Sequence, residues 1–317
     1  MSKKPKLVVI CGPTGVGKTG FAIRIARRFS GEIVGADSMQ IYRQMDIGTA
    51  KPTVSEQAAI RHHMVDIVDP DEDFDAAEYA RRAAACIKEL ASRSALPLVV
   101  GGTGLYIKAL LYGLSEDAPS DLRVRKALQT ELEQAGAAAM HRRLSRTDPL
   151  AARRLHPNDS YRILRALEVL ELTGQSICTH QQRHGFAHTP YDTLKIGLTL
   201  PREKLYADID RRVDLMLAKG LEDEVRRLLN CGYAATSKSM QALGYRHMHA
   251  YIDGCMDLDE AVRTLKRDHR RYAKRQMTWL RADSRLNWLT PTQLDDALEL
   301  VAAHLADRCG NDPQRLG

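Results

Sequence analysis

The chain has 317 residues, 44% of them hydrophobic and 27% charged, which is an ordinary composition for a folded globular protein. That length allows one sizeable core with an appended subdomain, and no apolar run approaches membrane-spanning length, so no membrane partner is expected. The formal net charge of +7 favours a polyanionic partner, but a generally basic enzyme surface explains the charge equally well.

The first predicted element is a strand over 6–11, an apolar run rich in β-branched residues that is typical of buried parallel strands. A partly amphipathic helix is predicted over 21–28. The segment between them matches the phosphate-binding pattern G-x-x-x-x-G-K-[ST] at every fixed position: Gly12, Pro13, Thr14, Gly15, Val16, Gly17, Lys18 and Thr19. In this context the loop amides and the helix N-terminus bind an anion, Lys18 adds a full charge, and the Thr19 hydroxyl can hold Mg²⁺. This P-loop predicts a site for a di- or triphosphate, and the flanking elements disfavour a chance match.

A second strand is predicted over 32–36, and Asp37 follows it directly. Because ligands of open parallel sheets lie at the carboxyl ends of the strands, Asp37 should lie near the phosphate. A helix N-cap is an equally good interpretation of Asp37 from the local sequence.

A third strand is predicted over 62–68, a helix over 76–93, and a fourth strand over 96–100. The fourth strand runs into a second glycine loop over 101–104, where the backbone can approach a ligand closely. A tight strand-to-helix turn is the alternative interpretation of that loop.

From about 119 to 191 the strand patterns vanish and arginine-rich helical segments replace them, which indicates a small helical insertion. A strand over 193–200 then returns to the parent sheet. We therefore predict an α/β fold, in which a P-loop parallel-sheet core with helices on both faces comprises residues 1–118 and 193–317. The helical insertion subdomain covers 119–192.

Two helices are predicted over 202–219 and 221–230, and the longest helix of the chain over 258–281. Basic residues recur along the long helix at steps of three, four and seven and form a basic stripe: Arg263, Arg267, Arg270, Lys274 and Arg281. A solvated helix face and a surface for nucleic-acid phosphates are equally good interpretations of this stripe.

The six cysteines are scattered without C-x-x-C spacing, so free thiols in a reducing cytosol are expected. The apolar run near the N-terminus is a six-residue strand, too short for a signal-peptide core, and a cytoplasmic location is expected.

A P-loop most often serves nucleotide hydrolysis or phosphoryl transfer, which need a strand-end carboxylate for Mg²⁺ and a group that orients the acceptor. The strand over 96–100 ends in glycines, and no nucleotide-specificity motif is evident, although Asp37 could supply the carboxylate. A P-loop kinase acting on a small nucleotide and a non-catalytic RNA-binding switch therefore remain alternative interpretations.

An ordered series of motifs is more specific than the P-loop alone. After the P-loop the series comprises Asp37-Ser38-Met39-Gln40-Ile41-Tyr42, Gly48-Thr49-Ala50-Lys51-Pro52, Gly101-Gly102-Thr103-Gly104-Leu105-Tyr106, His156-Pro157-Asn158-Asp159, Arg162-Ile163, Arg165-Ala166-Leu167-Glu168, Gly244-Tyr245-Arg246 and Lys274-Arg275-Gln276-Met277-Thr278-Trp279-Leu280-Arg281. Over about residues 5 to 290 the chain resembles the tRNA dimethylallyltransferases (tRNA isopentenyltransferases). It departs from the family pattern at Tyr161, where glutamine is expected, and at Leu243, where valine is expected.

The resemblance implies transfer of a dimethylallyl group from dimethylallyl diphosphate to the exocyclic N6 amine of an adenine beside the tRNA anticodon. It implies that Lys18, Thr19 and the P-loop amides hold the leaving diphosphate with Mg²⁺, and that Arg246 is a second cation on it. Asp37 is then favoured as the general base over the cap, and Thr103 as a residue that orients it.

The resemblance also implies a set of tRNA contacts, with the insertion clamping the anticodon stem-loop against the basic helix. This set comprises Asp37, Ser38, Met39, Gln40, Thr103, Arg125, Tyr161, Arg162, Ile163, Leu164, Arg165, Arg246, Lys274, Arg275, Gln276, Met277, Thr278, Trp279, Leu280 and Arg281.

Overall fold

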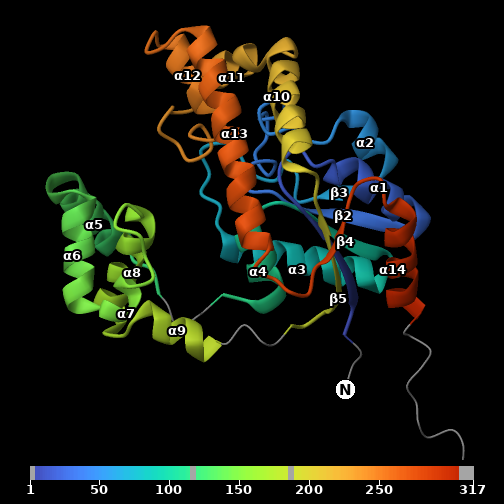
Figure 1. The fold of residues 1–317 in the computed structure, drawn as a ribbon, viewed down its shortest axis with the longest axis horizontal. Coiled ribbons are helices and arrows are strands. Elements are labelled where there is room, and N and C mark those ends of the chain that lie inside the picture. The colour runs from blue at the N-terminus through green and yellow to red at the C-terminus, as the bar shows by residue number, and fades with distance from the viewer. Residues whose placement is uncertain (1–3, 115–118, 185–188, 307–317) are drawn as a thin grey trace, which may run out of the picture. The chain divides into compact units, whose positions relative to one another are not determined.

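The computed structural model describes residues 4–114, 119–184 and 189–306, and it divides into two compact units. Unit 1 comprises 1–111 with 190–317, and unit 2 comprises 112–189 (Figure 1). The elements of unit 1 are β1 (Lys6–Cys11), α1 (Lys18–Arg28), β2 (Gly31–Ala36), α2 (Val54–Ala59), β3 (His62–His63), α3 (Ala76–Ser92), β4 (Leu96–Gly101), α4 (Gly104–Tyr112), β5 (Asp192–Leu198), α10 (Arg202–Ala218), α11 (Leu221–Asn230), α12 (Tyr245–Ile252), α13 (Leu258–Leu280), β6 (Asn287–Leu289) and α14 (Leu294–Ala306).

Unit 1 is built on one parallel sheet with the strand order β3-β2-β4-β1-β5-β6. β1 lies between β4 and β5, with Ile10 paired in register with Val100 on one side and Ile196 on the other. The P-loop that follows β1 therefore lies at the carboxyl edge of the sheet, in the middle of the strand order.

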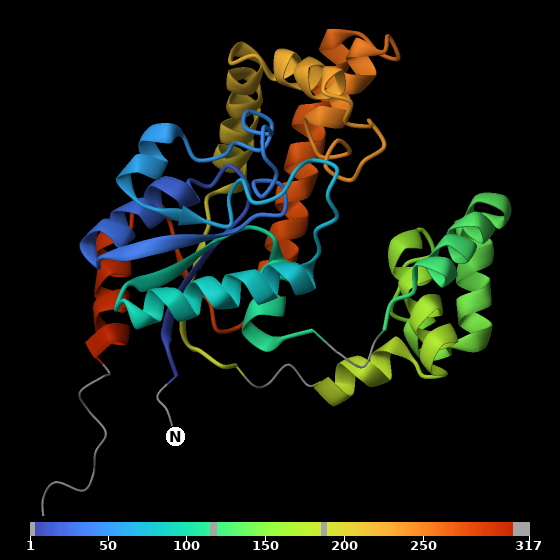
Figure 2. The ribbon, with the colours of Figure 1, turned by 180° about the vertical axis from the view of Figure 1, so that it is seen from behind.

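Helices cover both faces of this sheet, as predicted. Successive residues of a strand point to opposite faces, and all of Leu7, Val8, Val9 and Ile10 are fully buried. Val8 and Ile10 belong to a core cluster with apolar side chains of α1 and α14. The helix α3 packs against β2 and β4 outside that cluster (Figure 2). Its own buried side chains include Tyr79, Ala83, Ile87 and Leu90. The predicted α/β class with a parallel-sheet core is confirmed.

The predicted third strand is wrong in extent, because β3 covers only His62 and His63. Met64 and Asp66 adopt left-handed backbone conformations, with φ of 62° and 55°, and these conformations cannot continue a strand. Val68 returns to make one isolated parallel bridge with Tyr42. The sequence does not predict β6, which completes one edge of the sheet, or α14, which packs on α1.

Unit 2 consists of the helices α5 (Leu122–Ala135), α6 (Ala137–Thr147), α7 (Pro149–Ala152), α8 (Ser160–Thr173) and α9 (Ile177–His184). Aspartates 121, 148 and 159 cap the N-termini of α5, α7 and α8 with their side chains. The unit has its own apolar core, which includes Leu128, Met140, Leu144, Ile163 and Leu167. The predicted insertion, 119–192, starts and ends somewhat later than this unit.

Within the described part of the chain, no helix is both long enough and apolar enough to cross a bilayer. The five cysteines of that part are all free, and Cys309 lies outside it.

Candidate active site at the P-loop

The P-loop joins the end of β1 to α1, and two of its glycines adopt backbone conformations that other residues disfavour. Gly15 and Gly17 have φ of 85° and 91°, and Gly17 is the N-cap of α1. The first turn of α1 carries no acidic residue, and no side chain caps it. Its N-terminal amides are therefore available to an anion, which the positive end of the helix also attracts.

Lys18 folds back over this loop, and its Nζ donates a hydrogen bond to the carbonyl of Pro13 at 2.9 Å. The pKa of Lys18 is lowered to about 8, chiefly by burial; the carboxylate of Asp37 opposes this shift, and the nearby guanidinium of Arg212 contributes to it. Lys18 makes no ion pair among the described residues. A half-buried cation without a carboxylate partner is suited to neutralise a phosphate.

Arg212 of α10 supplies a second cation, and its guanidinium donates to the hydroxyl of Thr14 in the P-loop. Burial lowers its pKa, and its Nε is buried without a hydrogen-bond partner in the structure. The helix reaches the loop because Gly15 leaves room for Ile209, one turn before Arg212; a Cβ on Gly15 would lie 2.9 Å from Ile209.

These groups line a cavity of about 340 Å³, large enough for a small diphosphate ester. Its walls come from the P-loop, the end of β2, the 49–52 segment and α10, and include Thr14, Gly15, Gly17, Lys18, Thr19, Asp37, Gln40, Ala50, Lys51, Pro52, His62, Val65 and Arg212. Asp37 and the P-loop thus share one cavity, as predicted from their positions at strand ends.

Asp37 caps a turn rather than a helix. Its Oδ1 accepts from the amides of Met39 at 2.9 Å and Gln40 at 3.4 Å, and the residues that follow form turns. Within the described chain its Oδ2 accepts no hydrogen bond. The two interpretations of Asp37 are therefore compatible, because one oxygen caps the turn and leaves the other for a proton.

Thr103 contacts Ser38, the residue after Asp37, rather than Asp37 itself. Its Oγ1 accepts from the amide of Ser38 at 3.0 Å and lies 3.4 Å from the Ser38 hydroxyl. Thr103 therefore holds the turn that carries Asp37, which is an indirect form of the predicted orienting role.

The 101–104 glycine loop approaches α13 closely. A Cβ on Gly102 would collide with the side-chain amide of Gln276, and a Cβ on Gly104 with the indole of Trp279. Gln276 is 7% exposed, accepts from the amide of Thr14 at 2.8 Å and donates to the carbonyl of Gly102 at 3.0 Å. These glycines therefore serve close packing, and Gln276 joins the two glycine loops from α13.

Arg246, predicted as the second cation, lies in the first turn of α12 and pairs with Asp268 of α13 at 2.7 Å. It is not among the described residues that line the phosphate cavity. Within the described chain, Arg212 is the arginine that lines this cavity. The sequence carried a signal for it: Leu205, Ile209, Val213 and Met216 are the buried positions of α10, and Arg212 falls on the same face.

The basic stripe of α13 is partly neutralised by acidic residues of α10 and of α13 itself. Arg270 pairs with Asp210 of α10 at 2.5 Å, Arg263 with Glu260 at 2.7 Å, and Arg267 with Asp268 at 3.1 Å. Lys274 and Arg281 are exposed and make no ion pair within the described residues. The surface with free positive charge is therefore the C-terminal half of the stripe.

The predicted tRNA-contact residues differ in exposure. Tyr161 is 79% exposed and Trp279 is 39% exposed, so both present aromatic surface. The side chains of Ile163, Leu164 and Leu280 are buried in the apolar interior and cannot form a surface contact in this conformation.

In unit 2, Arg125 and Arg165 share one buried carboxylate. Glu168 is 1% exposed and accepts from Arg125 at 3.0 Å and from Arg165 at 2.8 Å. Arg162 pairs with Asp159 in the first turn of α8. The two arginines bound to Glu168 therefore also stabilise the helical unit.

The model of the IPP transferase family matches residues 40–283. The tRNA dimethylallyltransferase of Desulfosudis oleivorans is 54% identical over 286 residues, which cover 90% of this chain and 91% of that protein. The solved tRNA isopentenylpyrophosphate transferase of Bacillus halodurans has a TM-score of 0.73 and 40% identity, and the match covers 96% of this chain and 98% of that one. A solved eukaryotic dimethylallyltransferase acting on tRNA has a TM-score of 0.81 and 26% identity, and the match covers 98% of this chain and 82% of that one. The sequence-based resemblance is confirmed, and the chain belongs to the IPP transferase family.

Proposed function

We propose that the protein transfers a dimethylallyl group from dimethylallyl diphosphate to the N6 amine of an adenine beside the tRNA anticodon, releasing diphosphate. The observation that carries this proposal is the composition of one cavity. It is lined by the P-loop, by Asp37 and by Lys18 and Arg212, two cations that make no ion pair among the described residues. Membership of the IPP transferase family, with relatives named as tRNA dimethylallyltransferases, supports the same reaction.

The leaving diphosphate is bound by the P-loop amides, Lys18 and Arg212. As the bond between the allylic carbon and oxygen breaks, negative charge grows on the diphosphate, and cations fixed beforehand stabilise that charge more than they stabilise the bound donor. Burial strengthens this effect because water screens the two cations less inside the cavity.

Asp37 takes the proton of the adenine amine as the new carbon–nitrogen bond forms. An exocyclic adenine amine is a weak nucleophile, since its lone pair is delocalised into the ring, and a general base contributes roughly 10²–10⁴ to the rate of such a step. The second carboxylate oxygen of Asp37, which has no partner among the described residues, is the atom that accepts the proton.

Mg²⁺ fits this cavity as a partner of the diphosphate. The Thr19 hydroxyl lines the cavity and is an oxygen ligand of the kind the ion prefers, so it would hold the ion beside the diphosphate. Within the described residues no cluster of three or more His, Cys, Asp or Glu could hold a metal alone, which agrees with a substrate-borne ion. When bound, the ion neutralises diphosphate charge.

The tRNA presents its adenine from an unpaired loop, because extruding a base costs least where it is already single-stranded. Exposed Lys274 and Arg281 serve the phosphate backbone, and the exposed aromatic surfaces of Tyr161 and Trp279 serve unstacked bases. The free cysteines of the described chain agree with work in a reducing cytosol.

The test is to incubate the protein with unmodified tRNA, Mg²⁺ and dimethylallyl diphosphate and to weigh the tRNA by mass spectrometry. The expected product carries one added dimethylallyl group on an adenosine next to the anticodon, and parallel incubation with ATP leaves the tRNA unchanged. Phosphoryl transfer from ATP, or nucleotide-dependent RNA binding without a covalent product, would contradict the proposal.

A further inference from the structure

Glu224 of α11 is a buried carboxylate surrounded by uncharged donors. It is 2% exposed, and its oxygens accept from three consecutive backbone amides: Asp46 at 3.0 Å, Ile47 at 2.9 Å and Gly48 at 3.1 Å. The hydroxyl of Tyr245 donates a fourth hydrogen bond, at 2.6 Å. A buried carboxylate costs a large desolvation free energy, and these four donors offset that cost.

The three amides belong to a turn over residues 46–51, called here the Gly48 turn. Gly48 itself must be glycine, because a Cβ there would press into the ring of Tyr245, whose hydroxyl also binds Glu224. The carboxylate of Glu224 on α11 and the ring of Tyr245 on α12 thus both contact the start of this turn.

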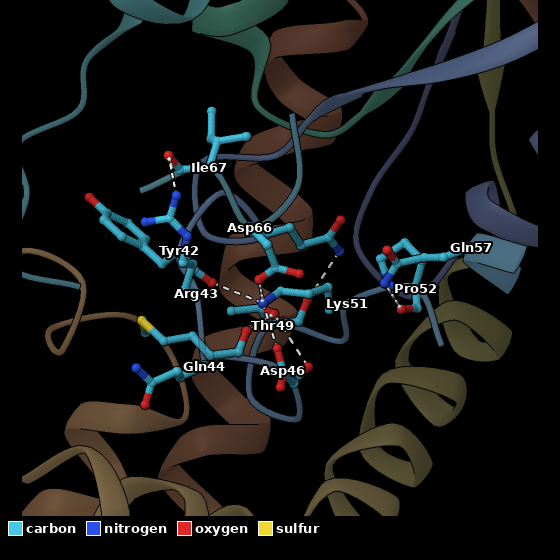
Figure 3. Close-up of polar contacts among 12 residues, drawn as sticks. Tyr42, Arg43, Gln44, Asp46, Thr49, Lys51, Pro52, Gln57, Asp66 and Ile67 are labelled. Atoms are coloured by element: carbon cyan, nitrogen blue, oxygen red, sulfur yellow. Dashed lines mark hydrogen bonds and ion pairs between the residues drawn. The ribbon is translucent and has the colours of Figure 1, made fainter. Parts of the chain in front are cut away.

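The end of the Gly48 turn is tied down separately (Figure 3). Lys51 Nζ lies 2.5 Å from carboxylate oxygens of both Asp46 and Asp66 and donates to the Tyr42 carbonyl at 2.9 Å. Gln40 donates to the carbonyls of Thr49 and Ala50 at 3.2 and 3.1 Å. Asp46 therefore connects the two ends, since its amide binds Glu224 and its carboxylate binds Lys51.

Two cavities meet at this turn. Ala50, Lys51 and Pro52 line the phosphate cavity and also an adjoining cavity of about 480 Å³, and Arg212 lines both as well. The helices α10 and α11 are joined through Gly220, so Arg212 and Glu224 lie on one helical hairpin. In this hairpin α10 places Arg212 at the P-loop, and α11 places Glu224 at the Gly48 turn.

We propose that Glu224 is a positioning residue for the prenyl donor: through the Gly48 turn it fixes Ala50, Lys51 and Pro52 relative to Arg212. The proposal rests on the proposed function, in which the donor's diphosphate occupies the P-loop cavity. It predicts that loss of the carboxylate loosens the wall on the donor side, while the surfaces assigned to tRNA on α13 and unit 2 are untouched.

The experiment compares Glu224→Gln with Glu222→Gln, a partly exposed position of the same helix that pairs with Arg226. Glutamine has nearly the shape of glutamate but lacks the charge, and its NH₂ group opposes backbone amides. We expect Glu224→Gln to raise KM for dimethylallyl diphosphate, and Kd for magnesium pyrophosphate, about tenfold or more. KM for tRNA should stay within about twofold, and Glu222→Gln should match the wild type.

A donor KM equal in both variants, or a tRNA KM that rises as much as the donor KM, would overturn the proposal. Should Glu224→Gln not fold, Tyr245→Phe decides: it keeps the ring beneath Gly48 and removes only one donor to Glu224. A smaller rise in donor KM supports the proposal and an unchanged value overturns it.

Lys18→Ala tests the P-loop assignment independently. Unchanged pyrophosphate binding in that variant refutes the proposed function and not the coupling of Glu224 to the turn.

Discussion

The P-loop cavity and the α13 stripe both carry basic residues, but their charges are in different states. Lys18 and Arg212 make no ion pair among the described residues and are partly withdrawn from water, which lowers the pKa of each. On α13, Arg263 and Arg270 are paired with carboxylates of their own chain. Only an unpaired cation has its full charge available to a ligand, so two residues in the cavity matter more than a longer run on the helix.

The largest effect is expected from Asp37, the carboxylate that faces the two cations. Asp37→Asn keeps the oxygen that caps the 37–40 turn, so the fold should persist and both substrates should bind. Loss of the proton acceptor should slow single-turnover prenyl transfer by roughly 10²–10⁴. The measurement uses labelled dimethylallyl diphosphate alongside a thermal melt, and near-normal transfer would remove Asp37 from the mechanism.

Two arginine substitutions compare a cation that lines the phosphate cavity with one that does not. Arg212→Ala should lower kcat/KM by roughly 10²–10³, because it removes a fixed cation from the developing diphosphate charge. Arg246→Ala, at the cation predicted from sequence, should cost much less, since its guanidinium is engaged by Asp268. Steady-state kinetics with both substrates measures the loss of kcat/KM in each variant. A larger loss in Arg246→Ala than in Arg212→Ala would favour Arg246 as the second cation.

The pKa of Lys18, lowered by burial to about 8, gives the cavity a pH dependence that the exposed arginines of α13 lack. Lys18 is charged below that pKa and loses its charge as the pH rises through it. We therefore expect kcat/KM for the donor to fall above about pH 8, by up to about tenfold per pH unit. In Lys18→Arg this fall should disappear, because arginine stays charged; an identical profile in the variant would assign the fall to another group.

The smallest effect is expected on α13, where a matched comparison uses paired and unpaired cations. Neutralising Lys274 and Arg281 to glutamine should flatten the salt dependence of tRNA binding, by about 0.7–0.9 log–log units per lost phosphate contact. Neutralising Arg263 and Arg270, which already have carboxylate partners, should change the slope less. Binding titrations at several salt concentrations measure the salt dependence of both double variants. Equal slopes would show that an ion pair in the free protein does not decide whether an arginine contacts the tRNA phosphates.

Much of the core could be predicted because its signals are local. The strand, loop and helix around Lys18 lie within 25 consecutive residues, and the glycine conformations that the loop requires are encoded at Gly15 and Gly17. The short β3 was mispredicted because an apolar run specifies burial, whereas the left-handed conformations at Met64 and Asp66 come from the surrounding structure.

By itself the sequence determined the P-loop, the places of β1, β2, β4 and β5 along the chain, and the family. Each of these three is carried by contiguous residues. Only the tertiary structure decided which distant groups meet them: Arg212 at the P-loop, Gln276 between the two glycine loops, and Glu224 beneath the Gly48 turn. The physical reason is that a backbone anion site is made by neighbouring residues. Which side chains of α10, α11 and α13 reach the P-loop or the Gly48 turn depends instead on how whole helices pack on the sheet.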